Sequence, residues 1–295
     1  MIAIIGGTGF YEVDGVSCPE QINVDTPFGE PSDGIVRSRL GEVPFLFLPR
    51  HGKGHRLMPS EINSRANIWA LKSLGATKIL SVSAVGSLRE SLHPGDLVLS
   101  DQYFDWTRGK REGTFFGNGV VAHVSTARPV CASFADSVGV SAARLGISVH
   151  RGGTYACVEG PRLGTRAESF FLRGAGCDLV GMTNVPEVFL AREARLCYAA
   201  VGIVTDWDCW LEDPSQHADV KKVLALYGAN LSRLKAIAAD LIAHDILASA
   251  ESPEAAVSPL PSPRCPCSAS VKESLMNQFD RLDSKKKELI EFLDA

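Results

Sequence analysis

Two carboxylic acids, Asp206 and Asp208, follow an apolar run in the sequence. Residues 201–204 have the composition of a buried strand, so the two acids should emerge at its end. At alternating positions of an extended segment, both carboxylates would point the same way. A carboxylic acid can protonate a ring nitrogen, and a carboxylate can accept a hydrogen bond from an exocyclic amine. The pair therefore favours a pocket for adenine as a leaving group, although two solvated acids in a turn would have the same spacing.

Two loops in the N-terminal part offer groups that bind anions. A glycine turn after the apolar start contains Thr8, whose hydroxyl and neighbouring N–H groups could cradle an anion. Its spacing is not G-x-G-x-x-G and no Lys-Ser or Lys-Thr follows, so neither a dinucleotide loop nor a Walker loop is indicated. Arg50 and His51 begin a basic, glycine-containing run, and an arginine fork fits phosphate oxygens. A tight turn and a solvated basic hairpin are the alternatives.

Two later loops offer hydroxyl groups in the same way. Ser83 lies among small residues that would let a ligand approach the backbone, and its hydroxyl is a donor. Thr183 lies close to the start of a predicted helix, which is a natural anion site, and Met182 could pack on the apolar face of a sugar or simply belong to the core. An anion site and a carboxylate pair at opposite ends of one pocket would suit attack by phosphate on a base–sugar bond.

Apolar, β-branched runs alternate with helix-like segments along the chain. The predicted strands are residues 1–5, 45–48, 78–83, 96–99, 148–154, 179–181 and 199–204, and the predicted helices are residues 62–74, 128–145, 166–174, 186–195 and 221–248. This alternation predicts a single α/β domain with a twisted, mixed but largely parallel central β-sheet flanked by helices. In such sheets ligands bind beyond the carboxyl ends of the strands, where the loops described above lie.

Composition and charge exclude several classes of function. The chain has 295 residues, of which 45% are hydrophobic and 22% charged, as in ordinary globular proteins. The net charge of −4 gives no electrostatic footprint for nucleic acid. No apolar run reaches the roughly 20 residues that span a bilayer, and the first residues lack the basic n-region of a signal peptide. We expect a cytoplasmic protein that binds neither nucleic acid nor membrane, with most cysteines as small core residues.

The composition changes after residue 248, which is where the domain is expected to end. Residues 249–269 are rich in Pro, Ser and Ala and are expected to form an extended surface segment. Residues 270–295 regain helical spacing. This spacing predicts a C-terminal helix that packs on the domain or on a neighbouring subunit, with lysines 285–287 on its solvated face.

Several motifs occur together in a characteristic order. They are residues 5–9, Arg-His-Gly at 50–52, 67–71, 83–88, Val-Glu-Gly-Pro-Arg at 158–162, 182–183, 186–187 and Thr-Asp-Trp-Asp-Cys-Trp at 205–210. In this order the chain resembles the 5′-methylthioadenosine phosphorylases, which belong to the trimeric purine nucleoside phosphorylases. The resemblance runs from residue 2 to about residue 226. It implies the fold of that family and makes residues 1–248 a nucleoside phosphorylase domain.

The resemblance implies a role for each matching residue. Phosphate would be held by Thr8, Arg50, His51, Ser83, the backbone N–H of Ala84, and Thr183. Asp206 would be the catalytic acid at N7 of the base, Asp208 would hold the 6-amino group, and Met182 would lie against the ribose. The 5′-methylthio group would be lined by Val220, Val223 and Leu224. His123 would reach the 5′ pocket of the neighbouring subunit in a homotrimer.

No metal or organic cofactor is implied, and the partners are a small-molecule nucleoside and inorganic phosphate as co-substrate. The chain departs from the family pattern at Leu163, which replaces an aromatic residue that would stack on the base, and at residues 106–111. Cys265 and Cys267 are similar to a C-x-C of some archaeal members and could close a small disulfide. In a reducing cytosol two thiols are expected. A metal site at this pair would lack a second pair of ligands.

The implied reaction is phosphorolysis of 5′-methylthioadenosine to adenine and 5-methylthioribose 1-phosphate, a step of methionine and purine salvage. Burial beside Trp207 and the charge of Asp208 should raise the pKa of Asp206 so that it holds a proton. A 6-oxopurine (methylthioinosine or inosine) phosphorylase, a hydrolytic nucleosidase and a nucleoside-binding protein without turnover are the alternatives. Two carboxylates argue against the first, because a 6-oxo site favours an amide that donates to O6. Asn184 lies near enough in sequence to blur this preference.

Overall fold

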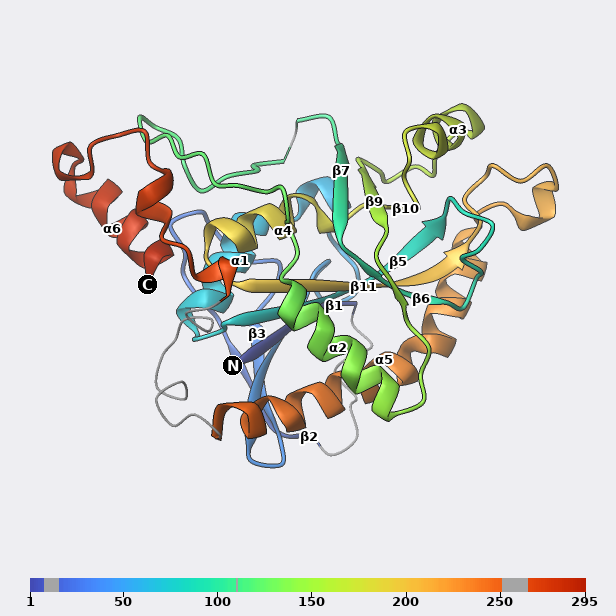
Figure 1. The fold of residues 1–295 in the computed structure, drawn as a ribbon, viewed down its shortest axis with the longest axis horizontal. Helices are drawn as coiled ribbons and strands as arrows, with labels where there is room; N and C mark the ends of the chain where they lie inside the picture. Colours follow the sequence, from blue (N-terminus) through green and yellow to red (C-terminus); the bar gives the residue numbers. More distant parts are fainter. Residues whose placement is uncertain (8–15, 110, 251–264) are drawn as a thin grey trace.

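The computed structural model of the chain describes residues 1–7, 16–109, 111–250 and 265–295, and within them eleven strands form one mixed sheet (Figure 1). The strands are β1 (Ile2–Gly6), β2 (Val16–Ile22), β3 (Ile35–Leu40), β4 (Val43–Pro49), β5 (Lys78–Ser87), β6 (Leu97–Ser100), β7 (Gln102–Trp106), β8 (His150–Arg151), β9 (Thr154–Val158), β10 (Leu179–Gly181) and β11 (Cys197–Asp206). The α-helices are α1 (Ser64–Ser73), α2 (Ala132–Arg144), α3 (Arg166–Gly174), α4 (Asn184–Glu193), α5 (Val220–Ala250) and α6 (Ser284–Asp294). The short 3₁₀ turns are η2 (Pro59–Glu61), η3 (Pro214–Gln216), η4 (Pro266–Ser268), η5 (Val271–Ser274) and η6 (Phe279–Arg281).

Four parallel strands form the centre of the sheet, in the order β4, β1, β5 and β11. Ser81 of β5 pairs with Ile5 of β1 on one side and with Ala200 of β11 on the other. The sheet is mixed because β6 runs antiparallel to β11 and β10 runs antiparallel to the end of β5. The carboxyl ends of the four central strands therefore meet at one edge, and the predicted fold class is confirmed.

Helices cover both faces of this sheet, which explains why its central strands are mostly apolar. On β1, Ile2 and Ile4 face one core cluster, and Ala3 and Ile5 face the other, as the alternation of a strand requires. Helices α2 and α5 pack together on the first face, below the sheet in Figure 1, and α1 and α4 pack on the second. The two layers hold the central strands rigidly, so the strand ends are a firm base for a site.

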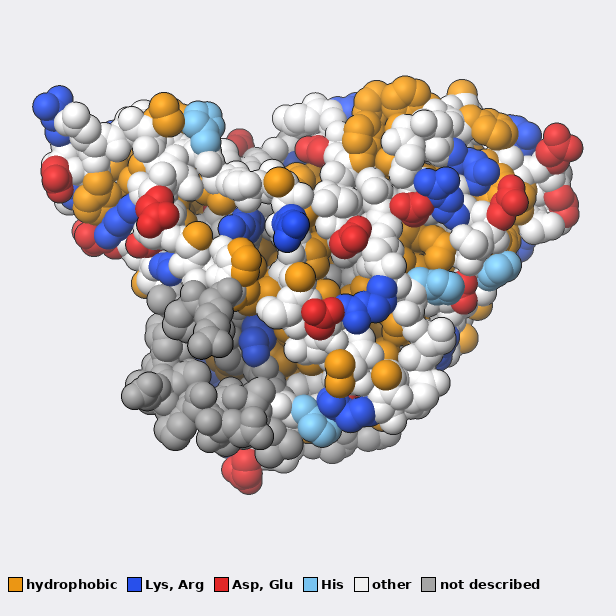
Figure 2. Space-filling model, in the orientation of Figure 1, with side chains coloured by type: hydrophobic (Ala, Val, Ile, Leu, Met, Phe, Trp, Pro, Cys, Tyr) orange, Lys and Arg blue, Asp and Glu red, His pale blue; other side chains and the backbone are white. Residues whose placement is uncertain are grey.

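Local sequence signals account for where several elements begin. Asn63 caps α1 by accepting from the N–H of Ala66. Thr165 and Glu168 form a capping box at the start of α3. Among the described helices, none combines the length and the apolar character that a bilayer crossing needs. On the face that Figure 2 shows, acidic and basic side chains are interspersed and no large field of one sign is present.

The structure corrects three of the expected elements. The strand expected over residues 148–154 is interrupted, because Gly152 and Gly153 have φ angles of 85° and 126° and separate β8 from β9. The end of the segment expected to be extended surface is instead a 3₁₀ turn with two buried cysteines. The C-terminal helix begins only at Ser284, after two short 3₁₀ turns.

The C-terminal helix packs on its own chain. Ile290 and Leu293 of α6 are buried in the second-face cluster, and Phe292 stacks on Trp69 of α1 with ring centroids 3.6 Å apart. The apolar residues of α6 are therefore spaced so that they face the rest of the same chain. Of the lysines at the start of α6, Lys285 is exposed, and Lys286 and Lys287 are half-buried.

Gly181, at the end of β10, is a position where a side chain would be costly. A Cβ there would lie 2.1 Å from the hydroxyl oxygen of Tyr155, which is itself buried. We expect Gly181→Ala to lower the free energy of unfolding by about 1–3 kcal/mol, because the core would have to move aside. Urea denaturation measures this. Gly228→Ala is the matched control: nothing lies near its Cβ position, and alanine favours the helix, so stability should not fall.

Candidate active site

A cavity of about 350 Å³ lies at the edge where the central parallel strands end. Of the residues predicted from the sequence, it is lined by Arg50, His51, Ser83, Ala84, Met182, Thr183, Asp206, Asp208, Val220, Val223 and Leu224. Thr8 lies outside the described residues. His123 is exposed on a loop and does not line this cavity. The strand ends thus bring the hydroxyl-bearing loops and the carboxylate pair to one space.

The carboxylate pair occupies one side of the cavity. Asp206 ends β11, and Asp208 follows in a turn with a φ of 52°. The expectation that strand alternation aligns the two side chains is wrong, because the strand ends between them and the positive φ redirects the chain. Instead, the backbone N–H of Asp208 donates to Oδ1 of Asp206 at 2.8 Å, and the hydroxyl of Thr205 donates to Oδ2 at 2.7 Å. Both carboxyl groups reach the cavity because of the turn at Asp208, and not because of the alternation of side chains along a strand.

Both carboxyl groups hold protons more tightly than ordinary aspartates. Burial raises the pKa of Asp206, and the neighbouring charge of Asp208 adds to that shift, while hydrogen bonds from Thr205 and from the Asp208 N–H oppose it. Burial also raises the pKa of Asp208. The direction expected for Asp206 is confirmed. A raised pKa is what a proton donor to a leaving group needs.

The other side of the cavity carries the hydroxyl groups. The hydroxyls of Ser83 and Thr183 each lie 3.4 Å from Oδ1 of the buried Asn184. Asn184 does not itself line the cavity, and its amide donates to Tyr103. The Asn184 side chain therefore forms its hydrogen bonds with Ser83, Thr183 and Tyr103, and none with the carboxylate pair among the described residues. Thr183 immediately precedes α4, but Val185 has extended dihedral angles, so the regular helix begins only after it.

Arg50 lines the cavity from a fully packed network. Its guanidinium donates to both carboxylate oxygens of Glu187, at 2.9 and 3.1 Å, and both side chains are 2% exposed. Further donors reach the carbonyl of Val82 at 2.8 Å and the hydroxyl of Ser81 at 2.6 Å. Burial would lower the pKa of Arg50, but the charge and hydrogen bonds of Glu187 outweigh it and raise the pKa. The pair fixes one permanent positive charge and one negative charge beneath the site.

His51 lies next to Arg50 and is a neutral ring. Burial lowers its pKa to about 4, and the charge of Arg50 acts in the same direction. Its Nδ1 is 2.9 Å from the carbonyl oxygen of Leu57. A carbonyl only accepts, so Nδ1 carries the proton and Nε2 is left as an acceptor. His51 therefore offers a hydrogen-bond acceptor, although it stands in a run of basic residues.

The third part of the cavity wall is apolar and faces outward. Val220, Val223 and Leu224 come from the first turns of α5, and all three line the cavity. Val220 and Leu224 are 60% and 63% exposed. Leu163 also lines the cavity and is 41% exposed. The rim of the cavity is thus an apolar edge open to solvent in the single chain.

Three residues of the site were not singled out from the sequence. Glu187 was quoted only within a motif, and nothing local shows that it pairs with Arg50 across 137 residues. Tyr227 lines the cavity from α5 and lies against Gly7. Gly86 has no side chain to place, yet a Cβ there would lie 2.9 Å from Oδ1 of Asp206. Gly86 therefore permits the close approach of β5 to the carboxyl group of Asp206.

The cysteine expectation also needs correction. A second pair of metal ligands does exist for Cys265 and Cys267: the sulfur atoms of Cys131 and Cys197 lie with theirs in one buried group. The four come from segments far apart in sequence, which is why the spacing of the C-x-C alone did not indicate them. None of the four lines the cavity.

Comparison with known proteins identifies the family of the chain. Residues 1–243 match the family model described as the phosphorylase superfamily. The chain is 50% identical over 239 residues to the S-methyl-5′-thioadenosine phosphorylase of Geobacter sulfurreducens, covering 80% of this chain and 82% of that protein. It is 48% identical over 241 residues to the enzyme of that name from Thermofilum pendens, covering 82% and 90%.

Solved structures give the same result. A methylthioadenosine phosphorylase from an Antarctic soil metagenomic library superposes with a TM-score of 0.87 at 39% identity, covering 99% of this chain and 98% of that one. The methylthioadenosine phosphorylase of Schistosoma mansoni in complex with adenine superposes with a TM-score of 0.83 at 38% identity, covering 94% and 99%.

Proposed function

Because this chain belongs to the phosphorylase superfamily, we infer that it cleaves the N-glycosidic bond of 5′-methylthioadenosine with phosphate, which yields adenine and 5-methylthioribose 1-phosphate. The observation that carries this inference is the two-sided cavity. A carboxyl pair with raised pKa values faces hydroxyl groups that suit an anion. A reaction that joins phosphate to a sugar while releasing a basic purine needs both sides.

The reaction follows from the charges. As the bond from C1′ to N9 stretches, the ribose becomes oxocarbenium-like and the purine gains electron density. We propose that Asp206 donates its proton to N7, so that adenine leaves as a neutral molecule, and that Asp208 accepts from the 6-amino group. Phosphate, held on the opposite face, stabilises the cation and then forms the bond to C1′ with inversion. Met182, in the wall between the two ends, would lie against the ribose.

The phosphate side is proposed to comprise Thr8, Arg50, His51, Ser83, the backbone N–H of Ala84, and Thr183. All of these except Thr8, which lies outside the described residues, line the cavity. The neutral His51 adds a specific point: an acceptor Nε2 would receive the hydroxyl of hydrogen phosphate, and the other groups would donate to its anionic oxygens. Phosphate is a co-substrate in this proposal.

A homotrimer belongs to the same proposal. What supports it is the open apolar rim formed by Val220, Leu224 and Leu163, together with the exposed His123, which lies away from the cavity of its own chain. Trp106 and Phe171 add exposed rings 4.9 Å apart near α3, where apolar side chains gather in Figure 2. A neighbouring chain could cover this rim and supply His123 to the 5′ pocket. The proposal also keeps the cytoplasmic location expected from the sequence.

Removing two hydroxyls tests the phosphate side. We expect Ser83→Ala combined with Thr183→Ala to raise the KM for phosphate by about 10²- to 10⁴-fold, since each of the two lost hydrogen bonds to a charged group contributes about 1.5–3 kcal/mol. Steady-state kinetics at varied phosphate measure it. Ser73→Ala is the control, because that hydroxyl donates to a helix carbonyl far from the cavity. An unchanged KM for phosphate in the double variant would place the anion site elsewhere.

The proposed function itself is tested by adenine release from 5′-methylthioadenosine with and without phosphate, alongside methylthioinosine. We expect turnover only with phosphate and a strong preference for the adenine compound. Turnover without phosphate would overturn phosphorolysis. A preference for methylthioinosine would leave the phosphate side intact and overturn the roles of the two aspartates.

A further inference from the structure

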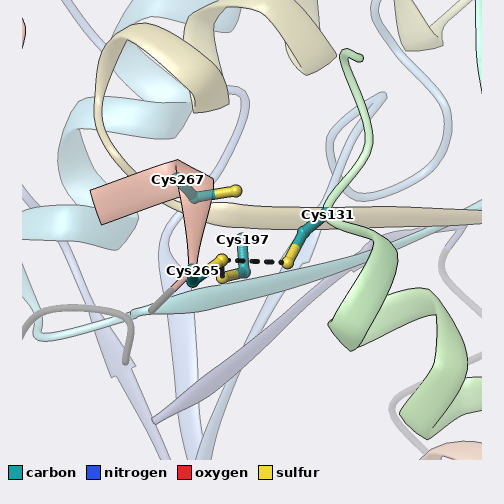
Figure 3. Close-up of side chains that lie close together, drawn as sticks. All are labelled: Cys131, Cys197, Cys265 and Cys267. Carbon is teal, nitrogen blue, oxygen red and sulfur yellow. Dashed lines mark hydrogen bonds between the residues drawn. The ribbon is translucent and has the colours of Figure 1, made fainter. Parts of the chain in front are cut away.

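Four cysteine side chains converge at a point that the proposed reaction does not use (Figure 3). Cys131 precedes α2, Cys197 begins β11, and Cys265 and Cys267 flank and occupy the turn η4. All four are buried, in the apolar cluster between the sheet and helices α2 and α5. We propose that these four sulfur atoms bind one Zn²⁺ ion as a structural site.

The distances fit a single tetrahedral ion. Sulfurs bound to Zn²⁺ at about 2.3 Å in a tetrahedron lie about 3.8 Å from one another. In the structure, Sγ of Cys265 is 3.5 Å from that of Cys131 and 3.7 Å from that of Cys197, and all four lie within 4.8 Å of one another. A disulfide needs about 2.05 Å between sulfurs. The arrangement is therefore that of four thiols around one centre.

Chemistry supports the same assignment. Four thiolate ligands with no open position are typical of structural zinc sites, and soft sulfur ligands favour zinc over magnesium or calcium. Zinc binds thiolates, so the ion would displace the thiol protons as it binds, with up to four protons released per ion.

The surrounding backbone already holds the ligands in place. The N–H of Cys131 donates to the carbonyl of Tyr198 at 2.9 Å, which fixes the start of α2 against β11. The N–H of Ser268 donates to the carbonyl of Cys265 at 2.9 Å and closes the turn that carries the C-x-C. Arg192 donates to the carbonyl of Pro266 at 2.7 Å, and Arg195 donates to that of Ser268. These two arginines also bring positive charge to a site whose four thiolates would exceed the charge of the ion by two.

The site would fasten the C-terminal segment to the sheet. Residues 265–295 follow the segment that the structure leaves undescribed, and η4 is where the chain rejoins the sheet. Downstream, the N–H of His123 donates to the carbonyl of Ser274 at 2.8 Å, and the N–H of Met276 donates to that of Val121 at 2.9 Å. A metal at η4 would therefore stabilise residues 265–295, which hold the His123 loop through these two hydrogen bonds. The metal itself would lie outside the cavity.

Metal analysis of the full-length protein tests the site. We expect about one zinc per chain after purification without chelator, by mass spectrometry of the metals. The variant Cys265→Ser with Cys267→Ser should lose it. Cys177→Ser is the matched control, because Cys177 is buried in a different cluster and should leave the zinc content unchanged. Zinc retained in the double variant, or lost equally in the control, would overturn the assignment.

A second measurement uses the native protein, in case the double variant does not fold. With zinc bound, the four cluster thiols should resist alkylation until a strong chelator is added, and Co²⁺ in place of zinc should show the visible bands of a tetrahedral thiolate complex. Native protein without metal, with its four cluster thiols freely alkylated, would overturn the proposal. So would an intact mass lower by the hydrogens lost to disulfides. Neither measurement depends on turnover of a nucleoside.

Discussion

Replacing Asp206 with Asn should lower kcat/KM for 5′-methylthioadenosine by about 10²–10⁴-fold, the usual cost of losing a general acid. The amide has nearly the shape of the carboxyl group: its oxygen can still accept from the Asp208 N–H, and its NH2 group can donate to the Thr205 hydroxyl in place of the bond that the carboxylate accepts. What it cannot do is transfer a proton to N7. The measurement is steady-state adenine release, and an unchanged rate would remove Asp206 from the leaving-group step.

The pH dependence of activity, measured for the native protein and for the Asp206→Asn variant, tests the same role of Asp206 independently. In the proposed reaction the proton on Asp206 is required for activity, and burial raises the pKa of Asp206. Activity of the native enzyme should therefore be highest below that raised pKa and fall as pH rises through it. In the Asn variant this fall should vanish along with most of the rate. A variant that keeps the same alkaline fall would assign that titration to another group.

The second large effect is on stability. Glu187→Gln should lower the free energy of unfolding by about 3–5 kcal/mol, because it leaves the buried charge of Arg50 without a counter-ion. The same change also weakens the hydrogen bonds that Ser81 and Tyr198 donate to Oε1, at 2.7 and 2.8 Å. Chemical denaturation measures it, provided that the native and variant proteins both unfold in one transition.

Glu193→Gln is the matched control for that change. Burial raises the pKa of Glu193 to about 7, its carboxyl accepts from Thr114 and from the N–H of Phe115, and the described residues include no ion-pair partner for it. A glutamine keeps an acceptor there, so the cost should be about 1 kcal/mol or less. If both substitutions lowered the free energy of unfolding by the same amount, the ion pair between Arg50 and Glu187 would not be the cause of the loss.

The sequence predicted the parts of the site that lie in or directly after the carboxyl-terminal halves of the central strands: Ser83 within β5, Asp206 at the end of β11 and Arg50 directly after β4. Arg50, Ser83 and Asp206 could be assigned to one edge because parallel strands place their carboxyl ends together. The same reasoning placed the helices that cover the sheet. It worked where a local pattern of apolar residues decides both the element and its direction.

The sequence did not predict features that depend on contacts between distant residues. The side chains of Asp206 and Asp208 reach the same cavity because Asp208 has a positive φ in a turn. The sequence has no glycine at this position that would have indicated such a turn. The burial of Glu187 depends on Arg50, and the cysteine group depends on Cys131 meeting Cys265 across 134 residues. Such contacts exist only after the sheet is assembled, so spacing along the chain carries no signal for them.

The Arg50–Glu187 pair also has a consequence for how the protein is made. Translation at about 5–20 residues per second needs about 7–27 s to add the 137 residues between the two partners. During that time the growing chain contains Arg50, which is buried in the folded protein, but not yet Glu187, which is its counter-ion there. The first three central strands can be complete in sequence, yet closing them around Arg50 would bury an unpaired charge. The N-terminal half is therefore expected to stay open on the ribosome until Glu187 emerges, and to close late and as one unit.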